Sequence, residues 1–377
     1  MPLFRRKFLV GAAAGASLSL FGPACGVGRA AASSLSAFDA ANAPRERLAP
    51  FRPRFGRARP LVAVAAVNAG TEMSDFIVPF GVLARSGVAD VVSVAMQPGP
   101  VNMRPLSFTL QSTLAAFDDA YPDGADYVIV PNVGPAPVPA LEAWVAAQAG
   151  KGASLVSICL GALIVARTGL MDGRRATSYF FNEKHRLDQF PAVKWQRNIR
   201  YVGDGDIISS AGISASMPVS VALVEAIAGR ERADALAREL GLADWSSRHD
   251  SDVFQRPRTD GARPGQQHFP TATLGIPVRP GDDEIALGLL ADAYGMTGEV
   301  QVMPVAETLE PVRLAHGLLV HPKRVAGDHG VDRIVPPVSA ERPVLALDRA
   351  LADITANYGA HIAEKVAWLM EYPGYPR

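Results

Sequence analysis

A hydrophobic segment that is interrupted by a single cysteine constrains the fold of this chain more than any other feature. Residues 154–158 are apolar enough for a buried strand, and residues 161–166 are small and apolar, as in a packed helix. A strand that turns straight into a helix at one reactive side chain is a nucleophile elbow, which requires small neighbours such as Gly161. Cys159 is therefore a candidate nucleophile, and the helix N-terminus is expected to lower the pKa of its thiol. The alternative is a packed core cysteine without chemistry.

Short apolar runs alternate with helical segments on the N-terminal side of this turn. Runs at 61–67, 88–96 and 125–130 are separated by amphipathic or apolar stretches, among them helices predicted at 73–85 and 139–150. Such alternation predicts an α/β fold, a flavodoxin-like parallel sheet sandwiched by helices. Ligands of such sheets bind beyond the carboxyl ends of the strands. Three predicted strand ends, at Gly70, Pro131 and Cys159, should therefore converge on one site.

Composition excludes several classes of partner. Basic and acidic residues number 37 each, and the first 32 residues contain four basic residues and no acidic one, so the remainder has 33 basic against 37 acidic residues. Nucleic-acid binding requires a basic face, so no nucleic-acid partner is expected. Two cysteines, Cys25 and Cys159, make no disulfide framework. No cofactor or metal is expected; His249 and Asp250 lack a convincing ligand spacing and are expected in a polar loop.

The N-terminus has the properties of an export signal. Arg5 and Arg6 precede an apolar stretch at 8–21 that is too short to span a membrane, and Ala30-Ala31-Ala32 offers a cleavage site. Residues 1–32 are therefore predicted to be a twin-arginine signal peptide, with a Sec-type leader or signal anchor as the alternative. The mature protein is expected in the periplasm or outside the cell. Residues 33–58 are predicted to be a linker, and no later run is long enough to span a membrane.

Three motifs that follow one another in the chain carry a family resemblance. They are Cys159-Leu160-Gly161-Ala162, the run Leu-Met-Asp-Gly-Arg-Arg-Ala-Thr at 170–177 and the run Asp-Gly-Asp-Ile-Ile-Ser-Ser-Ala-Gly at 204–212. In this order they resemble the ThiJ/PfpI (DJ-one) superfamily, which has the class I glutamine-amidotransferase-like fold. The most similar branch contains isonitrile hydratases and the sensor domains of AraC-type regulators. The resemblance implies a ThiJ/PfpI-like domain at 59–245, a small-molecule ligand or substrate and a homodimer.

The resemblance also assigns roles to individual residues. The family pairs its cysteine with an acid on the first helix, and Asp75 occupies that position, where it would hydrogen-bond the thiol or a substrate atom. Many members have a histidine base where this chain has Tyr179, whose hydroxyl is a poor base near neutral pH but donates hydrogen bonds. His185, six residues further on, lies in a charged stretch and is expected on the surface.

An oxyanion-binding site is incomplete by comparison with the family. Members often carry paired glycines after the third strand, and this chain has Pro131-Asn132-Val133-Gly134 there. The expected donors are the backbone N–H groups of the elbow, at Leu160 and Gly161, together with the side chain of Asn132.

A second, smaller α/β unit is predicted after a polar loop at 246–271. Shifting the chain by 211 residues aligns 61–101 with 272–312 without a gap, and strand, turn, helix and strand recur in the same order. Residues 272–377 are therefore predicted to be a partial repeat, with one long helix or a broken pair of helices at 346–371. Asp75 aligns with Ala286 and no cysteine follows Cys159, so the repeat lacks the chemistry.

Two functions remain open from the sequence. The first is an exported enzyme in which Cys159 attacks a small electrophile such as an isonitrile, an amide or a reactive carbonyl, in a hydratase, lyase or hydrolase reaction. The second is a non-catalytic protein of the same fold that binds a ligand or senses redox state through reversible oxidation of Cys159. Tyr179 in place of the usual histidine favours the second.

Overall fold

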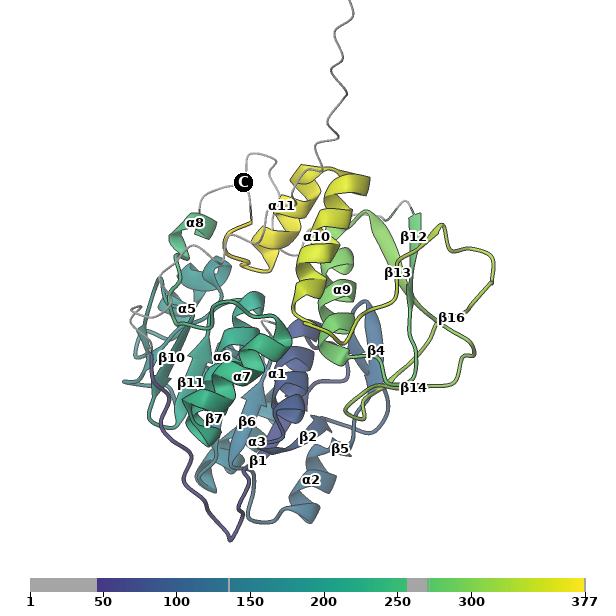
Figure 1. Ribbon diagram of the computed structural model, residues 1–377. Coiled ribbons are helices and arrows are strands. Elements are labelled where there is room, and N and C mark those ends of the chain that lie inside the picture. Colours follow the sequence, from purple (N-terminus) through teal and green to yellow (C-terminus); the bar gives the residue numbers. More distant parts are fainter. Residues whose placement is uncertain (1–45, 135, 256–269, 271, 376–377) are drawn as a thin grey trace, which may run out of the picture. The chain divides into compact units, whose positions relative to one another are not determined.

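A seven-stranded sheet carries the cysteine turn (Figure 1). The computed structural model describes residues 46–134, 136–255, 270 and 272–375, so the predicted signal peptide lies outside the described residues. From one edge to the other, the strands are β10 (Tyr201–Asp204), β11 (Ile207–Ser210), β7 (Ser154–Ser157), β6 (Tyr127–Val130), β1 (Leu61–Ala66), β2 (Asp90–Ala95) and β5 (Ser112–Thr113). Neighbouring strands are parallel except β10 and β11, which form a hairpin.

Helices cover both faces of this sheet, as the sequence predicts. Side chains alternate along β1, so Val62 and Val64 face one core while Leu61 and Ala63 face the other. The first core contains side chains of α1 (Met73–Ser86), α6 (Ser216–Ala228) and α7 (Arg230–Leu240). The second contains side chains of α2 (Leu114–Ala120), α3 (Pro139–Gly150) and α4 (Gly161–Arg167). The predicted flavodoxin-like sheet between helices is therefore confirmed.

A second α/β region follows and repeats the strand order of part of the first. Its four-stranded parallel sheet runs β16 (Arg324–Val325), β13 (Val300–Ala306), β12 (Ala272–Pro277) and β17 (Arg333–Ile334), with α9 (Glu284–Thr297) between β12 and β13. The order β16-β13-β12-β17 corresponds to β5-β2-β1-β6 of the large sheet. An offset of 211 residues carries β1 onto β12 and α1 onto α9 with the same first and last residues.

A third sheet joins the two regions. It consists of β14 (Val312–Arg313), β15 (Leu319–Val320), β4 (Leu106–Thr109) and β3 (Val101–Met103), all antiparallel. The hairpin predicted at 98–110 is β3 and β4. The shorter elements are β8 (Arg175–Ala176), β9 (Lys194–Trp195), α5 (Glu183–Gln189) and α8 (Asp252–Gln255).

The last part of the chain is a broken pair of helices, one of the two forms that the sequence predicts. Helix α10 (Leu345–Tyr358) and α11 (Ala360–Leu369) are separated at Gly359, whose φ of 92° is accessible mainly to glycine. The described part of the predicted linker is packed rather than free: Leu48 is buried and the Phe51 N–H donates to Ala226 O at 2.9 Å. No helix among the described residues is long and apolar enough to cross a bilayer.

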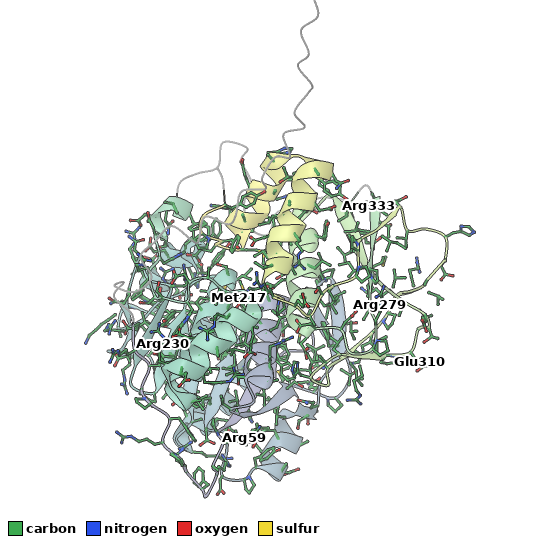
Figure 2. The ribbon with its side chains drawn as sticks, in the orientation of Figure 1. Arg59, Met217, Arg230, Arg279, Glu310 and Arg333 are labelled. Atoms are coloured by element: carbon green, nitrogen blue, oxygen red, sulfur yellow. The ribbon has the colours of Figure 1, made fainter. Side chains whose placement is uncertain are left out.

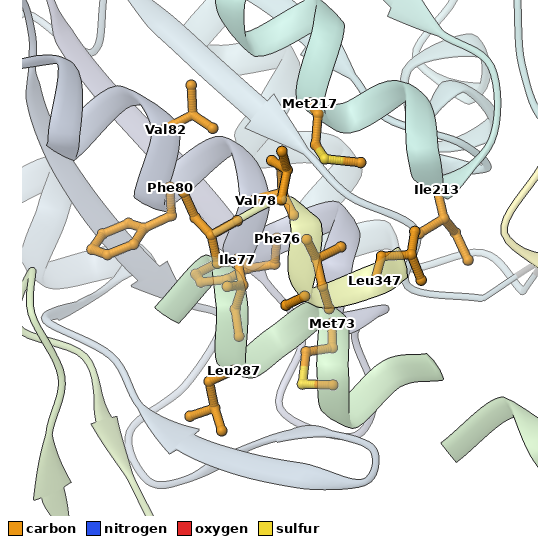
Figure 3. Close-up of a cluster of buried hydrophobic side chains, with 14 of the residues drawn as sticks. Met73, Phe76, Ile77, Val78, Phe80, Val82, Ile213, Met217, Leu287 and Leu347 are labelled. Carbon is orange, nitrogen blue, oxygen red and sulfur yellow. The ribbon is translucent and has the colours of Figure 1, made fainter. Parts of the chain in front are cut away.

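Helix α1 lies at the centre of the larger core. Figure 3 shows Met73, Phe76 and Ile77 of α1 with Met217 of α6 on one side and Leu287 of α9 on another. Charged side chains lie outside this core: Arg59, Arg230, Arg279 and Glu310 are exposed in Figure 2, whereas Met217 is buried. The C-terminal region therefore contributes to the same hydrophobic core as the first sheet.

The elbow requires glycine at position 161 because the next strand passes close to it. A Cβ at Gly161 would overlap the carbonyl oxygen of Val130, and the neighbouring carbonyl of Pro131 lies 2.9 Å from the same point. Backbone atoms of a central strand cannot move aside as the end of a flexible side chain can.

We predict that Gly161→Ala lowers the free energy of unfolding by about 1–3 kcal/mol, as overpacked core substitutions do. Gly150→Ala is the matched control, because Gly150 ends α3 with no heavy atom within 4 Å of its Cβ position. That control should be neutral or stabilise by up to about 1 kcal/mol, the helix propensity of alanine over glycine. Urea unfolding of both variants measures the difference. Equal stability of the two would contradict the close packing at the elbow.

Candidate active site

Cys159 occupies a strained turn between β7 and α4. Its φ is 55°, in the left-handed region that residues other than glycine rarely adopt. Two hydrogen bonds hold this conformation: the Cys159 N–H donates to Ala211 O at 3.1 Å, and Ser178 Oγ donates to Cys159 O at 2.8 Å. Strain of this kind persists where the surroundings fix it, commonly at functional sites. The predicted elbow geometry is therefore present.

Asp75 approaches the cysteine from the first turn of α1. Its side chain is 0 % exposed, and its Oδ2 accepts a hydrogen bond from the Asn132 N–H at 3.1 Å. The Cys159 thiol acts as a further hydrogen-bond donor that lowers the pKa of Asp75. The other carboxyl oxygen, Oδ1, has no partner of good hydrogen-bond geometry in the described part of the chain. The acid and the sulfur, 84 positions apart in the sequence, are thus neighbours in the structure.

Burial brings two carboxyl groups of this site to near-neutral pKa values. Burial raises the pKa of Asp75 to about 7, against the opposing hydrogen bonds from Glu72, Asn132 and Cys159. Glu72, the N-cap of α1, accepts the Asp75 N–H at 2.6 Å, and burial together with the charge of Asp75 raises its pKa to about 8. Both groups therefore change protonation state within the range where acid–base catalysis operates.

The Cys159 thiol is neutral at rest, and the expectation of a lowered thiol pKa is wrong. Cys159 is 2 % exposed, and burial raises its pKa well above the ordinary value, with the charges of Asp75 and Glu72 adding to the effect. The Leu160 N–H lowers the pKa, as a helix N-terminus should, but it opposes a larger desolvation effect. Thiolate formation therefore requires a proton acceptor, and Asp75 is in place to be one.

The remaining predicted site residues have other partners. Tyr179 is buried and its hydroxyl donates to Leu369 O at 2.9 Å, so the phenol anchors the end of α11. The Asn132 side chain accepts the Gly134 N–H at 2.8 Å, and the Gly161 N–H donates to Ile158 O at 2.8 Å. Of the predicted oxyanion donors, the Leu160 N–H is the one that acts on the sulfur. His185 is exposed, as expected.

Sequence reasoning missed a buried pair beside the elbow. His249 Nε2 lies 2.7 Å from Glu371 Oε1, and both side chains are at most 2 % exposed, so the expectation of His249 in a polar loop is wrong. Glu371 Oε2 accepts the Gly212 N–H at 2.6 Å, one residue after the carbonyl that holds Cys159. The charge of Glu371 contributes to the raised pKa of Cys159. Because His249 and Glu371 are 122 positions apart, no local pattern could have paired them.

A cleft of about 890 Å³ opens beside these carboxyl groups. Glu72 and Asn132, both hydrogen-bonded to Asp75, line it, and Gly70 lies on the same wall, as the predicted convergence of strand ends requires. Helix α9 provides Asp292 and Met296 on the opposite wall. Within the described ranges no group of three or more His, Cys, Asp or Glu is arranged to hold a metal ion.

Comparison with known proteins agrees with this geometry. Residues 61–226 match the model of the DJ-1/PfpI family. This segment is a DJ-1/PfpI domain. It accounts for somewhat less than half of the chain, and it contains Asp75, Asn132, Cys159 and Tyr179 but neither His249 nor Glu371.

Individual relatives are distant. The chain is 29 % identical over 181 residues to protein DJ-1 homolog A of Arabidopsis thaliana, covering 46 % of this chain and 44 % of that protein. It is 28 % identical over 117 residues to the HTH-type transcriptional regulator CdhR of Pseudomonas aeruginosa, covering 31 % and 34 %. The chain thus spans less than half the length of either curated relative. Drosophila melanogaster DJ-1beta aligns with a TM-score of 0.44 at 22 % identity, covering 49 % of this chain and 98 % of that structure.

The raised pKa of Asp75 predicts a pH-dependent cost to stability in the DJ-1/PfpI domain. A carboxyl with a folded-state pKa near 7 and an ordinary value of 3.8 binds its proton more tightly when folded, so stability is full below the ordinary pKa and lost as pH rises to the folded one. Asp75→Asn removes this loss. Its unfolding free energy relative to the parent protein should rise between about pH 4 and pH 8 by a few kcal/mol, at about 1.4 kcal/mol for each pKa unit. Urea unfolding at several pH values measures it; a constant difference would contradict a buried, titrating Asp75.

The position of Glu371 predicts that its charge suppresses thiolate formation. Glu371→Gln keeps the side-chain shape and an acceptor for the Gly212 N–H but removes the charge, so the Cys159 pKa should fall. Thiolate ultraviolet absorbance against pH measures this, with Cys159→Ser as the blank. Glu142→Gln, an acid of α3 paired with Arg167, is the matched control and should leave the titration unchanged. An unaltered titration in Glu371→Gln would show that the C-terminal acid does not act on the sulfur.

Proposed function

We propose that this protein is an exported cysteine-dependent hydratase or lyase that acts on a small electrophilic molecule. The observation that carries the proposal is the contact between the Cys159 thiol and the buried Asp75 carboxyl, whose pKa is about 7. A base is most effective when its pKa lies near the working pH, because it is then both ionised and able to hold a proton. Asp75 therefore replaces the histidine base that the position of Tyr179 does not provide.

The reaction follows from the positions of three groups. As the sulfur of Cys159 bonds to an electrophilic carbon, Asp75 accepts the thiol proton, and the Leu160 N–H stabilises the charge that develops. With an isonitrile, the proton is returned to the terminal carbon, which gives a thioimidate. Water then adds to that carbon and the thiol leaves, so that isonitrile and water become a formamide.

This chemistry demands less of the site than peptide hydrolysis does. The nitrogen stays attached to the carbon throughout isonitrile hydration, so no histidine is needed to protonate a departing amine. One carboxyl group that takes a proton and returns it is sufficient. Amides and reactive carbonyls of similar size remain within the proposal because they present the same electrophilic carbon to the sulfur.

Export is part of the proposal and is supported by the sequence of the first 32 residues. The paired Arg5 and Arg6, the apolar stretch at 8–21 and the alanines at 30–32 have the order of a twin-arginine signal. The enzyme would therefore act in the periplasm or outside the cell.

Turnover of three probes by the purified protein tests the proposal: a small alkyl isonitrile, a primary amide and methylglyoxal. We expect product from at least one, no turnover by Cys159→Ala, and a fall in kcat of about 100-fold or more in Asp75→Asn. The rate should fall as pH drops below about 7, because the protonated Asp75 cannot accept the thiol proton. Glu142→Gln should keep full activity as the matched control.

A redox-sensing or ligand-binding role is the second candidate, and the burial of Cys159 favours it. A thiol that is 2 % exposed and neutral at rest is protected from most reagents. If none of the three probes is turned over while peroxide converts the Cys159 thiol to a sulfenic acid with release of water, sensing replaces catalysis. Turnover that survives in Cys159→Ala would exclude both roles for the sulfur.

A further inference from the structure

The two halves of the chain are related by an approximate two-fold axis that passes between α1 and α9. The helices are antiparallel, and Ile77 faces Gly288, with the Cβ position of Gly288 3.0 Å from Ile77 Cγ2. Residues 77 and 288 are separated by the repeat offset of 211. In a self-complementary contact, a residue on the axis meets its own counterpart, as these two do.

The sheet that joins the two regions obeys the same relation. Thr109 pairs with Leu319, and Phe108 pairs with Val320. Adding 211 to 109 gives 320 and adding 211 to 108 gives 319, so the two pairs exchange under the repeat. The C-terminal region therefore meets the DJ-1/PfpI domain as one subunit meets another in a two-fold dimer.

The symmetry fails at the end of α1 that holds the site. At the far end, Gly81 packs against Ile285, and the contact is close and apolar. The counterpart of that contact pairs Ser74 with Asp292, and there Ser74 Oγ donates to Asp292 Oδ2 at 2.6 Å. The repeat thus places a carboxyl group where the DJ-1/PfpI domain has glycine. Asp292 is 4 % exposed, a costly position for an acid that has no function.

Asp292 is linked to Asp75 through Glu72. The carboxyl groups of Asp292 and Glu72 hydrogen-bond each other, and Glu72 Oε2 accepts the Asp75 N–H at 2.6 Å. Glu72 Oε1 has no further partner in the described parts of the chain, which fits a carboxyl pair that shares a proton. Both groups line the 890 Å³ cleft.

We propose that Asp292, supplied by the C-terminal repeat, is a positioning residue for the Asp75–Cys159 pair. The repeat does what a partner subunit would do in a dimer: it completes the first turn of α1 from outside, holding Glu72 against the Asp75 backbone. Its carboxyl also sets the pH at which Asp75 becomes a base. The inference rests on the proposed function in one respect, that Asp75 takes the thiol proton.

The sign of the electrostatic effect follows from the groups that face Asp75. They are Glu72 at the start of α1, Cys159 after β7 and Asp292 from α9, with the Asn132 N–H after β6. Tyr179 and Glu371 lie on the other side of the sulfur and act on the thiol. The charge of Asp292 raises the pKa of Asp75, so its removal should lower that pKa and extend the base form to lower pH.

Asp292→Asn tests the proposal in the full-length protein. The infrared band of the protonated Asp75 carboxyl, isolated as the difference from Asp75→Asn in the same background, should disappear at a lower pH than in the parent protein. The acid limb of the rate profile should move in the same direction. Asp353→Asn, which removes an acid of α10 paired with Arg333, is the matched control and should leave both unchanged.

A second variant covers the case in which Asp292→Asn does not fold. Ser74→Ala removes the hydroxyl that keeps Asp292 ionised, so it should shift the Asp75 titration in the same direction with both carboxyl groups still present. An unshifted Asp75 titration in the folded variants overturns the proposal, whatever the enzyme turns over. A shifted titration without turnover of any probe leaves the positioning role standing and removes the proposed function instead.

Discussion

The site depends on one unfavourable act of burial, in which an acid and a thiol are removed from water side by side. Asp75 and Cys159 are both almost fully buried, and desolvation raises the pKa of each. The carboxyl moves towards neutrality, where it exchanges protons readily, while the thiol moves away from it. A sulfur that is inert at rest is thereby placed next to the group that can activate it, and the strained turn at Cys159 keeps the two in register.

The surroundings of this pair come from every part of the described chain. Strand β6 provides the Asn132 N–H, α9 of the repeat provides Asp292, and the segment after α11 provides Glu371. Tyr179, where the family resemblance led us to expect a base, instead anchors that last segment through Leu369. The DJ-1/PfpI domain therefore contains the reactive pair, while the residues that adjust its protonation also come from outside the domain.

Much of the fold was predictable because its elements are local. Apolar runs of strand length, the small residues after Cys159 and the helix at 139–150 follow from short-range patterns, and the structure contains them. The offset of 211 was visible too, because the repeat kept its order of strand, turn and helix. The thiol pKa was not predictable, because a helix N-terminus is a local feature whereas burial beside two carboxyl groups is not.

The sequence by itself determined the elbow, the acid on the first helix and the repeated scaffold, since each is written in neighbouring residues or in a fixed spacing. The tertiary structure decided which charges surround the sulfur. His249 meets Glu371, and Ser74 meets Asp292, across 122 and 218 positions of chain. Such pairs depend on how helices and strands pack in three dimensions, and electrostatic energies depend on that distance and burial rather than on position along the chain.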